Sequence, residues 1–169
     1  MAELHEHEVL ERDESLASTL TNRGNFGYLK KGVLYLSMTE ALYLLNKKKI
    51  VIYKGKKELS SDEFHKYGRK SDKRFNLRYK VYSDLRERGY ITKTALKYGA
   101  DFRVYPRGKR MSEEHAKWVV FAVHEAEVFD WKKFAAMMRV AHSVRKNLLL
   151  AVLDDEGDVT YYEVNWIKP

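Results

Sequence analysis

Apolar positions in the first half of the chain follow strand and helix patterns in alternation. They predict, in order, a strand at residues 33–36, a helix through 41–45, a strand at 50–53 and a helical stretch from 60 to 87 with an interruption near 68–71. Capping boxes formed by Ser37 with Glu40, and by Ser60 with Glu63, mark where the two helical segments begin. Gly89 is placed to end the second segment.

After residue 89 the pattern changes to runs rich in β-branched and aromatic residues. These runs predict strands at residues 90–94, 101–105, 118–123, 148–153 and 159–166. Asp130 can cap a helix from residue 131 to about 144, and its inward stripe comprises Phe134, Met137, Met138 and Ala141. The pattern therefore indicates an α+β protein whose strand-rich second half carries a helix on its sheet. We place the boundary within residues 75–88 and expect the first 25 residues to be poorly structured or peripheral.

The charge of the chain favours an anionic partner. The net charge is +8, but residues 1–20 hold six acidic residues and one arginine, so the remaining 149 residues carry +13. A basic excess of this size is compatible with nucleic acid binding. A generic basic surface is the alternative.

Several classes of protein are excluded by composition. The chain contains no cysteine, which excludes a disulfide framework and a thiolate metal site. It has no run of about 18 apolar residues that could span a membrane, and its acidic N-terminus lacks the apolar core of a secretory signal. We therefore expect a soluble, cytoplasmic protein.

Tyr105, His115 and Lys146 form a set that could cleave RNA without a metal. Such a reaction needs a base for the ribose 2′-hydroxyl, an acid for the 5′ leaving oxygen and a cation for the phosphorane. Imidazole, with a pKa of about 6.5, suits the acid role, and lysine supplies a point charge. Tyrosine, with a pKa of about 10, is a poor base unless cations such as Arg103 and Arg107 stabilise its phenolate.

Each of these residues also has a structural alternative. Tyr105 could be a half-buried packing residue, His115 an exposed turn histidine, and Lys146 a residue that interacts with the dipole at a helix C-terminus. The phenol could also hydrogen-bond the phosphate while a water or the lysine takes the proton. His142 competes for the acid role, but its place beside the core position Ala141 favours a structural histidine.

In order and spacing, these segments resemble the archaeal tRNA-splicing endonucleases, the tRNA-intron lyases. The resemblance rests on residues 98–108, His115 and residues 141–146, and it continues through residues 83–98 and 154–162. It implies a small helix-rich N-terminal α/β domain followed by a C-terminal mixed-sheet nuclease domain with packed helices, at residues 1–80 and 81–169 respectively. It also implies excision of introns from precursor tRNA at bulge–helix–bulge motifs by metal-independent transesterification. The expected products carry 2′,3′-cyclic phosphate and 5′-hydroxyl ends, and no cofactor is needed.

The resemblance also implies a role for each candidate residue. Tyr105 is the general base, His115 the general acid and Lys146 the group that stabilises the transition state. Arg139 matches one of the arginines between which the family sandwiches a flipped base, and a planar guanidinium suits stacking. The alternative for Arg139 is a surface contact to phosphate or to a neighbouring glutamate. Ser143, Arg103 and Arg107 are further candidates for RNA contacts.

Four carboxylates lie on one tight turn of this basic protein: Asp154, Asp155, Glu156 and Asp158. A solvated hairpin turn is the ordinary explanation. The resemblance implies instead that this loop inserts into a basic cleft of a partner subunit. The apolar last strand would be a liability as an exposed edge, and pairing it across a two-fold axis would form a dimer. Two dimers joined through the loops give a homotetramer, although a heterotetramer with a separate structural subunit is also possible.

Two other functions remain open from the sequence. The chain could be a non-catalytic structural subunit or RNA-binding module on the same scaffold, but such a protein has no need of all three candidate catalytic residues. A DNA-directed nuclease would require clustered carboxylates for Mg²⁺, whereas the candidate segments carry mainly cations.

Overall fold

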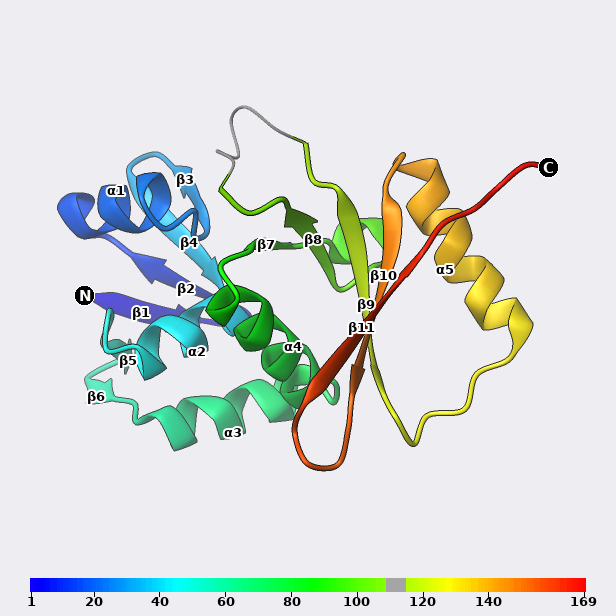
Figure 1. The fold of residues 1–169 in the computed structure, drawn as a ribbon. Helices are drawn as coiled ribbons and strands as arrows, with labels where there is room; N and C mark the ends of the chain where they lie inside the picture. The colour runs from blue at the N-terminus through cyan, green and yellow to red at the C-terminus, as the bar shows by residue number, and fades with distance from the viewer. Residues whose placement is uncertain (109–114) are drawn as a thin grey trace. The chain divides into compact units, whose positions relative to one another are not determined.

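The computed structural model describes residues 1–108 and 115–169, and its course is drawn in Figure 1. The chain forms two compact units, Met1–Tyr79 and Lys80–Pro169, each with its own sheet. The division falls inside the helix α4 (Phe75–Glu87). No helix in the described part of the chain is both long enough and apolar enough to cross a bilayer.

The first unit is built on a six-stranded mixed sheet in the order β3-β4-β2-β1-β5-β6. Its strands are β1 (Ala2–His5), β2 (Glu8–Glu11), β3 (Tyr28–Lys30), β4 (Val33–Ser37), β5 (Ile52–Lys54) and β6 (Lys57–Glu58). Its helices are α1 (Glu14–Asn22), α2 (Met38–Asn46) and α3 (Ser61–Ser71). Leu34 and Leu36 of β4 are fully buried in the core that these helices share with the sheet.

Both capping boxes predicted from the sequence are confirmed. The Ser37 hydroxyl caps α2 and the Ser60 hydroxyl caps α3, and in each case the glutamate three residues later binds back to the backbone N–H of the serine. At α3 the ammonium of Lys57 also binds Glu63. The hydrogen bond from Lys57, followed by those from Ser60, lowers the pKa of Glu63 to about 2.

The expectation that the first 25 residues are peripheral was wrong. Residues 2–5 and 8–11 form β1 and β2, which lie in the interior of the sheet order, and Ala2 and Val9 are fully buried. The acidic residues hid this pattern because Glu3 and Glu8 alternate with the buried positions and point to the other face of the sheet. Glu3 and Glu8 therefore lie on the outward face of two core strands, whereas Glu11, opposite Ala2, is buried and accepts a hydrogen bond from the N-terminal amine.

The second unit is built on a five-stranded mixed sheet in the order β11-β10-β9-β8-β7. Its strands are β7 (Ile91–Thr94), β8 (Phe102–Tyr105), β9 (Trp118–His124), β10 (Asn147–Leu153) and β11 (Val159–Val164). A short 3₁₀ helix, η1 (Leu96–Tyr98), follows β7, and α5 (Trp131–Ser143) connects the parallel strands β9 and β10. The predicted cap is confirmed, since the Asp130 carboxylate accepts from the backbone N–H of Lys133 at 2.8 Å.

The two faces of this second sheet are covered by different helices. Val119 and Leu148 point to the face that packs against α5, where Met137 and Ala141 are buried. Residues 80–87 of α4, which belong to this unit, contact the opposite face, where the centre of the Tyr82 ring lies 5.7 Å from that of Phe102. Neighbouring residues of each strand therefore face different helices.

Asp101, just before β8, fixes the alignment of β8 with β9. Its side chain is buried and accepts a hydrogen bond from the backbone N–H of Ala122 at 2.8 Å. Its own backbone N–H donates to the carbonyl of Val120 at 3.0 Å. The pairing that follows sets Arg103 opposite Val119 and Val104 opposite Trp118.

Candidate active site

The ends of three strands bring the predicted catalytic segments to one end of the second sheet. β8 ends at Tyr105, β9 begins three residues after His115, and β10 begins directly after Lys146. The backbone N–H of Lys117 donates to Val104 at 2.9 Å, and the N–H of Asn147 donates to Lys117 at 3.0 Å. The three segments are thus linked strand to strand.

Lys146 makes the direct side-chain link between two of these segments. Its Nζ donates to the carbonyl of Ala116, the residue after His115, at 2.7 Å. The end of α5 sets its position, because Arg145 adopts a left-handed conformation and the N–H of Lys146 donates to Ala141 at 3.0 Å. Burial lowers the pKa of Lys146, and the nearby charge of Arg103 lowers it further.

Tyr105 lies at the end of β8 on the same face as Arg103, two residues earlier. Its side chain is only 7% exposed. This burial is compatible with the packing alternative and with catalysis, since a base needs only its oxygen to reach the substrate. The guanidinium Nε of Arg103 is also buried and has no hydrogen-bond partner among the described residues.

His115 is exposed, unlike Tyr105. It directly precedes Ala116, whose carbonyl Lys146 holds, so the histidine is carried on a segment with a fixed end. Arg107, the other predicted RNA contact of this region, is exposed and lies over the ring of Tyr90 at 5.3 Å.

Two adjoining hollows lie at the end of α5. The first, about 360 Å³, is lined by Lys146 and Arg145, and the second, about 440 Å³, by Arg139 and Phe134. They share three lining residues, Met138, His142 and Trp166. Arg139 and Lys146 are therefore brought to neighbouring hollows. The hydroxyl of Ser143 is exposed but donates to the carbonyl of Val140 at 2.8 Å, within its own helix.

The sequence favoured a structural role for His142, next to the core position Ala141. His142 is exposed, and its ring lies 4.7 Å from that of Trp166 between the two hollows. The exposure of His142 follows from helix geometry, because the next residue along a helix lies about 100° away from a core position such as Ala141. The sequence placed Trp166 in the last strand, whereas it lies two residues after the end of β11, and no local pattern marked it as a site residue.

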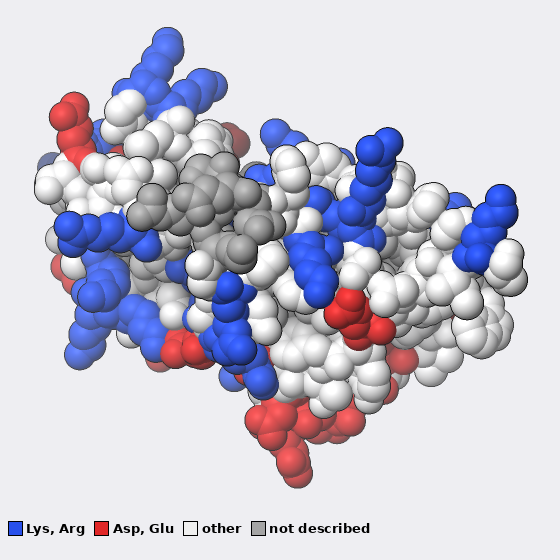
Figure 2. Space-filling view, turned by 45° about the horizontal axis from the view of Figure 1, so that its top comes forward, with Lys and Arg blue, Asp and Glu red and all other residues white. Residues whose placement is uncertain are grey.

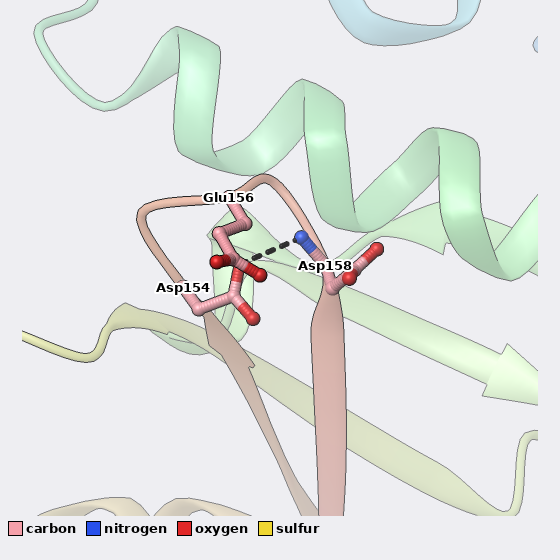
Figure 3. Close-up of side chains that lie close together, drawn as sticks. All are labelled: Asp154, Glu156 and Asp158. Atoms are coloured by element: carbon pink, nitrogen blue, oxygen red, sulfur yellow. Dashed lines mark hydrogen bonds between the residues drawn. The ribbon is translucent and has the colours of Figure 1, made fainter.

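The acidic turn connects β10 to β11. One carboxylate oxygen from each of Asp154, Glu156 and Asp158 lies within 4.8 Å of the other two. The N–H of Asp158 donates to Asp154 at 2.8 Å, the bond marked in Figure 3. The N–H of Asp155 donates to Glu125 at 2.7 Å, and its carboxylate lies 3.3 Å from His124. Like charges held this closely favour a cationic partner.

In Figure 2, lysine and arginine side chains are spread over the face in view, and acidic side chains lie among them and at the lower edge. The last strand, β11, lies at one edge of its sheet. Tyr162 on that strand and Trp166 after it are 57% and 59% exposed.

Comparison with known proteins identifies both halves of the chain. The model of the tRNA intron endonuclease catalytic C-terminal domain matches residues 75–161, and that of the N-terminal domain matches residues 1–65. A tRNA-splicing endonuclease of Thermococcus onnurineus is 46% identical over 158 residues, which cover 94% of this chain and 90% of that protein. Its counterpart in Nanoarchaeum equitans is 47% identical over 140 residues, covering 79% and 90%. The one in Methanothermobacter thermautotrophicus is 41% identical over 155 residues, covering 92% and 90%.

These matches confirm the resemblance, including its archaeal character, and they extend it to residues 1–65, upstream of the segments on which it rested. They also confirm the α+β fold with two mixed sheets. The chain is an endonuclease that belongs to the tRNA intron endonuclease family.

Proposed function

We propose that this protein excises introns from precursor tRNA by cutting bulge–helix–bulge RNA without a metal ion. The observation that carries the proposal is the convergence of Tyr105, the His115 segment and Lys146 at one end of the second sheet, with Lys146 bound to the carbonyl after His115. The matched catalytic-domain model spans this whole region. With such a substrate, the reaction takes place in the cytoplasm.

Tyr105 takes the proton of the ribose 2′-hydroxyl, and the 2′-oxygen forms a bond to phosphorus. The bond from phosphorus to the 5′-oxygen breaks, and His115 gives a proton to that oxygen. Lys146 balances the charge of the phosphorane between these steps. The products are a 2′,3′-cyclic phosphate and a 5′-hydroxyl.

Arg139 and Trp166 are placed to hold a flipped base. Both line the second hollow, which carries little polar surface other than the guanidinium and His142. A base stacked there contacts the planar guanidinium and the indole ring. Ser143, Arg103 and Arg107 make contacts to the RNA backbone in this proposal.

We infer a homotetramer, a dimer of dimers, as the assembly. The exposed edge of β11 supports pairing across a two-fold axis, and Val128 and Trp131, 95% and 83% exposed, add apolar surface in the same unit. The acidic turn supports the second contact, in which its carboxylates enter a basic cleft of another subunit.

Cleavage of a bulge–helix–bulge RNA in the presence of EDTA tests the activity. We expect cutting at both bulges, with cyclic phosphate and 5′-hydroxyl ends. A requirement for Mg²⁺, or ends that carry a 3′-hydroxyl, would contradict the mechanism. Binding without any cleavage would point to the alternative, a structural subunit or RNA-binding module.

A further inference from the structure

A third hollow lies on the opposite face of the second sheet, under α4. It has a volume of about 240 Å³ and a floor formed by Leu85, Val104 and Leu149. The rings of Tyr90, Trp118 and Tyr161 line it, with Arg88 and Glu163 as its charged groups. The phenol of Tyr161 donates to Asp84 at 2.7 Å, so this wall is fixed. Its lining is thus mostly aromatic and apolar, with a single carboxylate.

This hollow lies at the same end of the sheet as the candidate active site. Trp118 follows Lys117, two residues after His115, and it pairs with both Val104 and Asn147. Tyr105 and Lys146 are the residues adjacent to those two partners. Because side chains alternate along a strand, the candidate catalytic groups and the hollow occupy opposite faces of the same strand ends.

Two further cations, outside the lining itself, lie over aromatic rings that line the hollow. The Nζ of Lys117 lies 4.5 Å from the centre of the Trp118 ring, and the guanidinium of Arg107 lies 5.3 Å from that of Tyr90. The rings of Tyr90 and Trp118 meet edge to face, with centres 6.0 Å apart. Lys117 and Arg107 are both exposed, so a phosphate can reach them from solvent.

We propose that this hollow binds one nucleobase of the RNA beside the cleavage site, while Lys117 and Arg107 hold the flanking phosphates. This inference rests on the proposed function. Aromatic faces and a cationic rim are the features by which proteins hold single-stranded nucleotides. The hollow, at about 240 Å³, has room for one base. Glu163 can accept a hydrogen bond from an amino group of the base.

The ordinary alternative is that Trp118 only braces the sheet. Its indole N–H is buried and has no hydrogen-bond partner among the described residues. Replacing Trp118 with Phe therefore removes no hydrogen bond and keeps an aromatic face, whereas Leu removes the face. The pair Trp118→Phe and Trp118→Leu separates stacking from simple filling of space. Tyr98→Leu is a matched control, because Tyr98 is an exposed aromatic residue of the same unit.

The experiment measures the affinity of full-length protein for a bulge–helix–bulge RNA, with His115→Ala present to prevent cutting. The RNA is also made as a series in which each nucleotide near a bulge is abasic in turn. Loss of base stacking costs about 1–3 kcal/mol, so we expect Trp118→Leu to weaken binding about 5- to 140-fold. Trp118→Phe and Tyr98→Leu should stay within about threefold of the parent. The RNA that lacks the bound base should bind the parent protein weakly. Trp118→Leu should weaken the binding of that RNA no further, because the ring and the base form a single contact.

If Trp118→Leu fails to fold, the abasic series on the parent and the exposed variant Lys117→Gln still test the inference. Lys117→Gln should reduce the salt dependence of binding by about one ion. Equal weakening of every RNA by Trp118→Leu, or no weakening at all, would show that the ring only braces the sheet. Cleavage by the unaltered protein is measured in parallel. Cleavage without the base-specific coupling would overturn this inference alone, while absence of cleavage would remove the proposed function as well.

Discussion

Replacing Lys146 with Met removes both its charge and its hydrogen bond to Ala116, while keeping most of its apolar stem. Losing a group that stabilises a developing charge costs about 10²–10³ in kcat, and we expect that loss in single-turnover cleavage with saturating enzyme. The buried carbonyl of Ala116 also loses the donor at 2.7 Å. An unsatisfied buried carbonyl costs about 1–3 kcal/mol, so the free energy of unfolding in urea should fall by a similar amount.

Lys146→Arg separates these two effects because guanidinium keeps the charge and the donors. It should recover most of the stability and part of the rate. The pH profile gives an independent test, since burial lowers the pKa of Lys146 and only the charged amine stabilises the phosphorane. Activity of the unaltered protein should fall as pH rises through that lowered pKa, whereas Lys146→Arg should show no such fall, because arginine stays charged.

The two measurements together decide the role of Lys146. A stability loss in Lys146→Met with kcat within about threefold of the parent would make the lysine a brace between two segments. Loss of rate without loss of stability would show that the Ala116 contact is not maintained in solution.

Four further predictions follow from the structure. His115→Ala should slow cleavage by about 10²–10⁴, as expected for a lost general acid, with RNA affinity unchanged in gel shifts; Tyr105→Phe should behave alike, and full activity of either variant would contradict its role. Arg139→Lys keeps the charge and loses the planar face, so cleavage should fall more than binding to unbulged RNA, and equal small losses would leave only a phosphate contact. Neutral amides at the four acids of the β10–β11 turn should halve the particle mass in light scattering at moderate salt, and an unchanged four-subunit mass would refute the role of the turn. Because the pKa of Glu63 is lowered from 4.5 to about 2, its ionised carboxylate should stabilise the protein at pH values above 4.5, and this contribution should disappear as the pH falls to about 2. The difference in thermal unfolding temperature between the parent and Glu63→Gln should therefore vanish between pH 4.5 and about 2. A difference that stays constant over this range would contradict the lowered pKa.

Local signals in the sequence were reliable in predicting where helices begin. Ser37 and Ser60 each meet a glutamate three residues later, so the whole capping contact lies within one turn. The first two strands were missed although they pair with each other, because the acidic residues within them interrupt the apolar pattern. β1 also pairs in parallel with β5, near residue 52, and no local pattern in residues 2–5 predicts that pairing.

The candidate site was predicted in its residues but not in its contacts. The family resemblance singled out Tyr105, His115 and Lys146 from their order and spacing. The bond from Lys146 to Ala116 joins positions 30 residues apart, and only the paired strand ends bring them together. The neighbouring positions of His142 and Trp166 also arise from tertiary packing, since a helix end meets the tail of the last strand.

The buried side chain of Asp101 destabilises any form of the protein in which β8 pairs with β9 in the wrong alignment. A strand that slips by one residue turns all of its side chains to the other face. In β8 such a slip would set Val104 in the direction now taken by Tyr105, and a four-residue strand could still keep most of its backbone hydrogen bonds. The result would be a folded protein in which Tyr105 no longer points into the candidate active site. The buried carboxylate of Asp101 has its N–H partner on Ala122 only in the native alignment, so the slipped form would leave a buried charge with that bond unmade. Asp101, which is not one of the candidate catalytic residues, thus makes a misaligned β8 unstable, whereas without it the misaligned protein could fold unnoticed.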